Sequence, residues 1–137
     1  AYLYTGWGLC STLLYRGALL RGKAGGCAGN IGWMPNNARL EQAVIQQGWT
    51  DTTGQAISQA AAALLHLAQP DVMVIENHLP SVIGEPEQYL RERLPQLMQV
   101  NEGEIIPEII GFGSDESQAQ DGLSLMLREQ WLHQLLG

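Results

Sequence analysis

A short glycine turn near the start of the chain has residue types that can bind an anion. The tetrapeptide TGWG occupies residues 5–8. Because glycine lacks a side chain, the backbone N–H groups of such a turn can approach a phosphate closely, and the Thr5 hydroxyl adds another hydrogen-bonding group. A hairpin turn without a ligand has the same pattern, because glycine is common where strands reverse. Both interpretations stay open, with Thr5, Gly6 and Gly8 as candidate ligand-binding residues.

A second glycine-rich segment, residues 25–33, lies in a long loop without periodicity that can wrap a small molecule. Asn30 carries both a donor and an acceptor for a sugar hydroxyl, and Trp33 offers an apolar face for a sugar ring. Together with Gly29, these residues form the second candidate ligand-binding set. The alternative is a surface loop whose Trp33 fills a gap in the core.

The start of the chain is basic, whereas the rest is acidic. Residues 1–50 hold four Lys or Arg and one acidic residue, and residues 51–137 hold three and thirteen. The basic part coincides with the glycine-rich part, which suits an anionic or sugar-phosphate ligand, unless a few surface charges merely fall there. The net charge of −7 disfavours a protein that binds nucleic acid over its whole surface, because phosphate contacts need clustered Lys and Arg.

The ionisable residues predict neither a metal site nor a catalytic motif. His66, His78 and His133 lack the spacing of metal ligands, and Cys10 and Cys27 lack the second pair that zinc needs, although a disulfide between them stays open. No Ser-His-Asp order, P-loop or HExxH motif occurs, so no catalytic residue is assigned. His78 follows an expected parallel strand, where open α/β sheets bind ligands, but a turn position explains it equally well. A reduced, cytoplasmic protein is the simplest interpretation.

A scaffold of strands and helices must position these residues. The chain has 137 residues, of which 45% are hydrophobic and 15% charged, so it fits a single domain, residues 1–137. The expected strands are residues 2–5, 9–15, 18–21, 71–75 and 104–110. The first three predict an antiparallel meander, and the apolar run at 71–75 predicts a parallel strand buried on both faces. Pro107 splits the last strand or moves it to an edge. No apolar run is long enough to cross a bilayer.

Helix-like segments separate the later strands. The expected helices are residues 38–47, 50–67, 86–98 and a last helix from residue 114. Thr50 or Asp51 can cap the second helix and Pro70 ends it, whereas Pro95 should break or kink the third. Strands that alternate with helices predict an α/β protein in which helices pack on a mixed sheet.

The order of these motifs resembles the ROK family of repressors, open reading frames and sugar kinases. TGWG, RGALLRG and AGNIGWM are similar to that family's glycine turn, hairpin and sugar loop. AQPDVMVIENHLP is similar to its later strand, and DESQAQDGLSLMLREQWLHQLLG to its last helix. The resemblance spans nearly the whole chain and implies the C-terminal lobe of an actin-like, ribonuclease-H-like fold. It also implies that an N-terminal lobe, and any helix-turn-helix, belong to sequence outside this chain.

The departures from the family pattern concern the chemistry. The family's sugar-contacting Glu falls on Asn30, its sugar- and zinc-binding His falls on Trp33, and its CxCGxxGC zinc loop is missing. The kinases' glycine-rich turn falls on Glu76, Asn77 and His78, a candidate nucleotide-side loop in which a carboxylate facing ATP would repel its phosphates. The kinases' catalytic Asp belongs to the lobe outside this chain. The resemblance therefore implies no zinc and no catalytic residue here, with ATP and Mg²⁺ only in a kinase.

The loop ENHLP and the end QWLHQLLG are closer to the family's repressors than to its kinases. We therefore expect the ligand-sensing and dimerisation lobe of a sugar-responsive transcriptional regulator. Its ligand would be a sugar or sugar phosphate, it would form a homo-oligomer away from any membrane, and it would contact DNA only through a segment outside this chain. The alternative is the C-terminal lobe of a divergent kinase that phosphorylates a hexose or amino sugar with ATP. A third interpretation is an α/β domain that only binds a partner.

Overall fold

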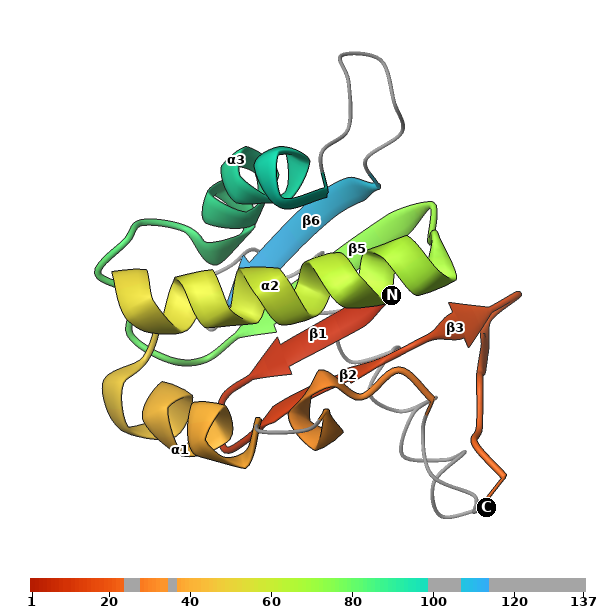
Figure 1. The fold of residues 1–137 in the computed structure, drawn as a ribbon, viewed down its shortest axis with the longest axis horizontal. Helices are drawn as coiled ribbons and strands as arrows, with labels where there is room; N and C mark the ends of the chain where they lie inside the picture. The colour runs from red at the N-terminus through yellow and green to blue at the C-terminus, as the bar shows by residue number, and fades with distance from the viewer. Residues whose placement is uncertain (24–27, 35–36, 99–106, 114–137) are drawn as a thin grey trace.

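A four-stranded mixed sheet forms the centre of the protein (Figure 1). The computed structural model describes residues 1–23, 28–34, 37–98 and 107–113. The sheet order is β2-β1-β5-β6, with β1 (Tyr2–Thr5), β2 (Leu9–Thr12), β5 (Val72–Asn77) and β6 (Glu108–Gly113). β2 is antiparallel to β1, whereas β1, β5 and β6 run parallel. The predicted α/β architecture with a mixed sheet is confirmed.

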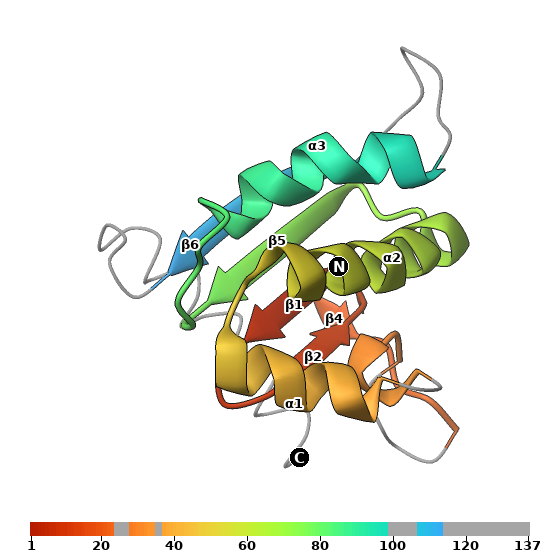
Figure 2. The ribbon, with the colours of Figure 1, turned by 60° about the vertical axis from the view of Figure 1, so that its left-hand side comes forward.

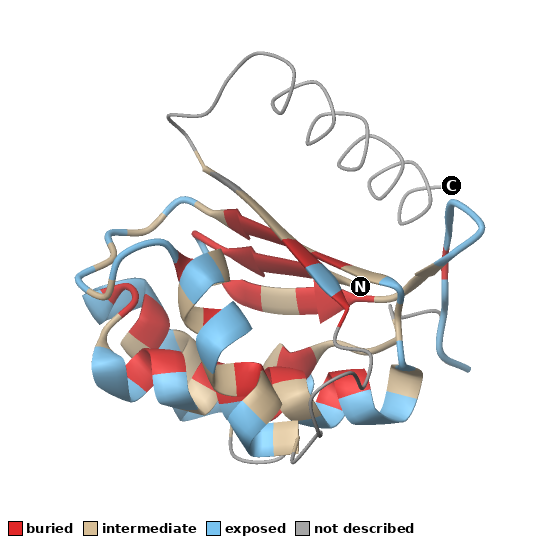
Figure 3. Ribbon diagram, turned by 90° about the horizontal axis from the view of Figure 1, so that it is seen from above, coloured by how far each residue is buried: buried red, intermediate tan, exposed pale blue. Residues whose placement is uncertain are grey.

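The helices of the described residues pack against one face of the sheet (Figures 2 and 3). They are α1 (Ala38–Gln47), α2 (Asp51–Ala68) and α3 (Pro86–Met98), with a short 3₁₀ helix, η1 (Ile31–Trp33). The crossovers from β1 to β5 and from β5 to β6 run in the same direction across the sheet, which puts α2 and α3 on the same face. Pro95 lies inside α3, which continues to Met98, so the predicted break does not occur. The fully buried side chains between the helices and the sheet include Leu3, Val44, Trp49, Ile57, Met73, Ile75, Leu90 and Leu94.

Helix α2 begins and ends where the sequence predicts. Thr50 caps it: the Thr50 hydroxyl accepts the Thr53 N–H at 3.2 Å, and the Thr53 hydroxyl accepts the Thr50 N–H at 2.8 Å. Gln69 follows the helix in the left-handed region, with φ of 46°, and Pro70 cannot extend it. The chain therefore turns directly into β5, one of the two parallel strands that carry the candidate site.

The predicted meander leaves the sheet after its second strand. β2 ends at Thr12, and β3 (Leu14–Tyr15) pairs with β4 (Ala18–Leu19) in a separate two-stranded sheet. The turn between them has positive φ at both Arg16 and Gly17, as a two-residue hairpin requires. The prediction of one strand over residues 9–15 is wrong at Leu13, because its N–H donates to the Ala28 carbonyl at 3.2 Å instead of a neighbouring strand.

The last described strand lies at an edge of the sheet, as one of the two outcomes predicted from Pro107 requires. β6 starts at Glu108, directly after Pro107, and continues to Gly113. Proline has no N–H to donate to a strand ladder, which explains why Pro107 itself stands outside β6. Residues 104–106 of the predicted strand and the predicted helix from residue 114 lie outside the described residues.

Candidate functional site

Two of the sequence motifs meet where β1 and β5 end. The parallel register places Thr5 beside Asn77 and Tyr4 beside Glu76, and the His78 N–H donates to the Thr5 carbonyl at 2.8 Å. The TGWG turn, residues 5–8, therefore lies next to the loop formed by residues 76–78. We call these two segments together the strand-end site.

The Thr5 side chain links the strand-end site to the helices. Thr5 is completely buried, and its hydroxyl accepts the Trp49 Nε1–H at 3.0 Å and donates to Asn77 Oδ1 at 2.9 Å. The Asn77 amide in turn closes a turn with Leu79, accepting its N–H at 3.0 Å and donating to its carbonyl at 2.9 Å. The Thr5 hydroxyl thus positions protein groups, which leaves the surface of the turn as the part that can meet a ligand.

Protein acceptors also engage N–H groups of the TGWG turn. Gly6 donates to the Gly8 carbonyl at 3.0 Å, and the Trp7 N–H lies 3.4 Å from the Tyr4 hydroxyl oxygen. Directly after the turn, the N–H of Leu9, the first residue of β2, donates to a carboxylate oxygen of Glu41 on α1 at 3.1 Å. A Cβ at position 6 would lie 2.3 Å from the Tyr4 hydroxyl, so any other residue there would force the Tyr4 ring to move. The turn is held by side chains from two directions.

A row of rings lies on the opposite side of β1 from Thr5. The Tyr4 ring centroid is 5.5 Å from that of Trp7 and 5.8 Å from that of His78, and we call these three residues the aromatic row. Trp7 is 77% exposed, whereas Tyr4 is 9% exposed. Because successive side chains alternate along a strand, the row lies on the face away from the helices. It offers an exposed indole with a buried aromatic support.

A carboxylate lies next to the aromatic row. The Glu76 side chain is 1% exposed, and its Oε1 lies 2.5 Å from Nε2 of His78. An ionised carboxylate can only accept hydrogen bonds, so with Glu76 ionised the imidazole donates from Nε2. The His78 side chain, 31% exposed, is therefore fixed in orientation while part of its ring stays accessible.

The second predicted segment packs along β2, the strand that follows the TGWG turn. Oδ1 of Asn30 caps η1 by accepting the Gly32 N–H at 3.0 Å, and it also accepts the Ser11 N–H at 3.2 Å. A Cβ at Gly32 would lie 2.3 Å from the Leu9 carbonyl oxygen, which shows how closely η1 approaches β2. Trp33 is 78% exposed, so the alternative in which it fills a gap in the core is wrong. The Asn30 carbonyl oxygen has a structural role, and Trp33 is left open to solvent.

Gly29, the remaining candidate of that segment, shapes the backbone. Its φ is 80°, in the region that favours glycine, and an added Cβ would lie 2.7 Å from Leu13. Its carbonyl accepts the Ser11 hydroxyl, which in turn accepts the Ile31 N–H at 2.8 Å. Gly29 therefore fastens the loop to β2.

Sequence reasoning missed the residues that hold the turn from a distance. Glu41 and Trp49 lie 32 and 44 positions from their hydrogen-bond partners Leu9 and Thr5, and no local pattern reveals such pairs. The alternation of side chains along β1 was the available signal for Tyr4, because it places Tyr4 and Thr5 on opposite faces.

The described residues contain no group of three or more His, Cys, Asp or Glu that could hold a metal ion. Cys27 and His133 lie outside these residues. Within the described part of the chain, no helix combines the length and apolarity needed to cross a bilayer.

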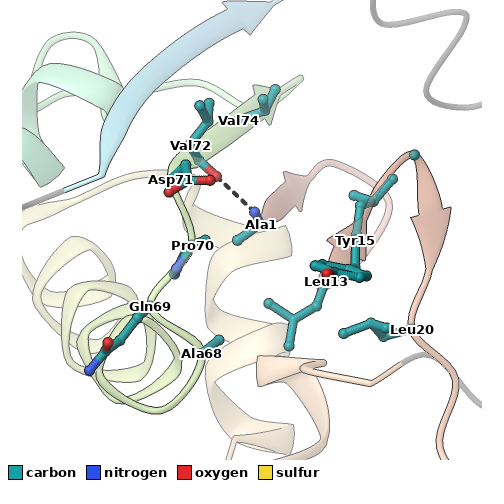
Figure 4. A pocket seen from close by; sticks show the side chains of 12 residues that line it. Ala1, Leu13, Tyr15, Leu20, Ala68, Gln69, Pro70, Asp71, Val72 and Val74 are labelled. Carbon is teal, nitrogen blue, oxygen red and sulfur yellow. Dashed lines mark hydrogen bonds between the residues drawn. The ribbon is translucent and has the colours of Figure 1, made fainter.

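A cavity of about 570 Å³ lies at the opposite edge, where β1 and β5 begin (Figure 4). Leu13, Tyr15 and Leu20 line one side of it. The α2–β5 junction lines the other side, with Gln69 and Asp71 as its polar side chains. None of the residues that the sequence marked as ligand-binding lies there.

Comparisons with known proteins add no relative. No protein-family model, curated protein or solved structure matches the chain. The chemistry of the strand-end site therefore follows from its geometry.

Proposed function

We propose that this chain is the ligand-sensing and dimerisation lobe of a ROK-type regulator and that it binds a sugar at the strand-end site. One observation carries the proposal: the TGWG turn and the loop at residues 76–78 are separate in sequence but meet where β1 and β5 end, and Gly32 of the third segment packs on Leu9, directly after the turn. The parallel pairing of β1 with β5 brings the ends of these strands together, where open α/β sheets bind ligands.

The exposed groups at this edge suit a sugar. The indoles of Trp7 and Trp33 are 77% and 78% exposed and provide apolar faces for the C–H surface of a ring. The His78 imidazole, oriented by Glu76, adds a polar group for a hydroxyl. Apolar platforms with a few oriented polar groups are the usual composition of a small-molecule site.

The sheet supports the family assignment. An antiparallel hairpin followed by parallel strands is the arrangement that the resemblance to actin-like, ribonuclease-H-like lobes implies, and β2-β1-β5-β6 has it. In this proposal DNA contact belongs to sequence outside this chain, and the lobe works in the cytoplasm as a homo-oligomer.

The kinase alternative has less support. A kinase would bring ATP phosphates to the loop at residues 76–78, where the Glu76 carboxylate lies buried at the end of β5. A buried carboxylate repels phosphate strongly because little water screens it. The regulator, which needs no nucleotide, avoids this conflict.

Calorimetric titration of the intact protein with hexoses and their 6-phosphates tests sugar binding. We expect saturable binding of at least one hexose, weakened about three- to tenfold in Trp7→Ala or Trp33→Ala by the loss of ring contact. Tyr15→Ala, which removes a 60% exposed aromatic residue at the other edge, is the matched control and should leave affinity unchanged. Asn30→Ala is less informative because Oδ1 of Asn30 also holds the loop. If no sugar binds, or if both tryptophan variants bind like wild type, the proposal is wrong.

A further inference from the structure

We infer that Glu41 excludes anions from the TGWG turn, so the ligand that approaches this turn is a sugar without a phosphate. The inference narrows the ligand class of the proposed function and rests on that function for the sugar itself. The exclusion of anions can be tested without any sugar.

The Glu41 carboxylate occupies the place where an anion would bind. Its Oε2 accepts the Leu9 N–H at 3.1 Å and would lie 3.5 Å from a Cβ at Gly8, so a negatively charged oxygen is in contact with the turn. A glycine turn attracts phosphate through its N–H groups. Here the Leu9 N–H, directly after the turn, already donates to Glu41, and the Glu41 carboxylate places a negative charge beside the turn.

The position of Glu41 is fixed by its helix. Glu41 lies in the first turn of α1, where a carboxylate is favoured by the helix dipole, and its N–H donates to the Asn37 carbonyl at 3.0 Å. The Asn37 side chain donates to the Ile31 carbonyl at 2.7 Å, which ties the start of α1 to η1. The carboxylate therefore comes from a supported element rather than a free loop.

Two N–H groups of the turn already face acceptors of the protein. Gly6 donates within the turn and the Trp7 N–H faces the Tyr4 hydroxyl, so a phosphate would have to displace these contacts as well. Two like charges a few ångströms apart in a partly buried site lower the affinity for an anion by about tenfold or more. A neutral sugar ring meets no such penalty and can use the exposed Trp7 face.

The first experiment titrates inorganic phosphate into the ¹⁵N-labelled protein and follows the amide signals of Gly8 and Leu9. We expect no saturable shift in wild type and a saturable shift in Glu41→Ala, with affinity raised about tenfold or more. Glu41→Gln should gain less, because its amide oxygen can still accept the Leu9 N–H without carrying charge. Glu92→Gln on α3 removes the same charge far from the turn and should behave like wild type. A saturable shift of these amides in wild type, or no gain in either Glu41 variant, overturns the inference.

The second experiment compares glucose with glucose 6-phosphate by calorimetry. Wild type should favour glucose by about tenfold or more, and Glu41→Gln should narrow that preference. A preference for the phosphate in wild type, or an unchanged ratio in the variant, contradicts the role of Glu41. Absence of binding by the whole hexose panel contradicts the proposed function instead, and the phosphate titration then still decides the exclusion of anions.

Discussion

The two ends of the parallel strands β1 and β5 have opposite characters. Where the strands begin, a cavity of about 570 Å³ is lined mainly by apolar side chains. Where they end, polar side chains are linked by hydrogen bonds that connect Thr5, Trp49 and Asn77, and an exposed indole stands on the Tyr4 ring. Size alone would select the cavity as a binding site, whereas oriented polar groups and aromatic faces select the strand ends. The candidate site is therefore identified by its oriented polar groups and aromatic faces rather than by the volume of a cavity.

The largest expected effect compares a buried residue of the strand-end region with one at the cavity. Trp49 is completely buried and its backbone also bonds to Pro80 and Val82, so Trp49→Ala should lower the free energy of unfolding by about 3–5 kcal/mol. Leu20, 41% exposed at the cavity, should lose about 1 kcal/mol or less on change to Ala. Urea denaturation followed by circular dichroism measures both. If both variants lose the same free energy of unfolding, the strand-end region is no more important for stability than the cavity edge.

The Thr5 hydroxyl provides the next test. Thr5→Val keeps the shape of the side chain but leaves the buried Trp49 Nε1–H without its acceptor, which should cost about 1–3 kcal/mol. Thr52→Val makes the same chemical change at an exposed position of α2, and we expect less than about 0.5 kcal/mol. If the two variants have the same stability, the hydroxyl does not link β1 to the helices in solution.

Structural features that depend on neighbouring residues could be predicted from the sequence, whereas those that depend on distant residues could not. The α2 cap at Thr50 and its end before Pro70 were predictable because each depends on residues within one helical turn. The departure of Leu13 from the sheet was not, because its partner Ala28 lies 15 residues away and belongs to a loop without periodicity. Local rules locate elements, but they do not tell which distant backbone group competes for a strand's hydrogen bonds.

The candidate site also has parts that the sequence predicted and contacts that it did not predict. The sequence marked both the TGWG turn and the loop at residues 76–78, and the parallel pairing of β1 with β5 explains why they meet. It did not predict that Oδ1 of Asn30 would cap η1, or that Glu41 would reach the Leu9 N–H from another helix. These contacts depend on how η1 and α1 pack on β2, which is a tertiary property.

The two glycines of the TGWG turn should differ in how well they tolerate alanine, with a smaller effect on stability than the changes above. Gly6→Ala places a Cβ 2.3 Å from the Tyr4 hydroxyl, so Tyr4 must move at a cost of about 1 kcal/mol, the low end for overpacking. Gly8→Ala is the matched control, because its nearest neighbour, a Glu41 oxygen, would lie at 3.5 Å, an ordinary contact. Thermal unfolding should separate the variants, and the tryptophan fluorescence of the protein, to which Trp7 contributes, should change only in Gly6→Ala. Identical spectra for both variants would contradict the close packing of the turn on Tyr4.

The smallest expected effect lies at the cavity and decides between the two edges. Tyr15 is 60% exposed and its ring centre lies 5.2 Å from the Arg16 guanidinium, so Tyr15→Ala should cost about 0.5 kcal/mol. Because the ring lines the cavity, its removal would still alter binding if the cavity held the sugar. We therefore expect unchanged hexose affinity in Tyr15→Ala alongside weakened affinity in Trp7→Ala, measured by the same calorimetric titration. The reverse pattern would move the binding site to the edge where the strands begin, because only a ligand held there is sensitive to a side chain with so little role in stability.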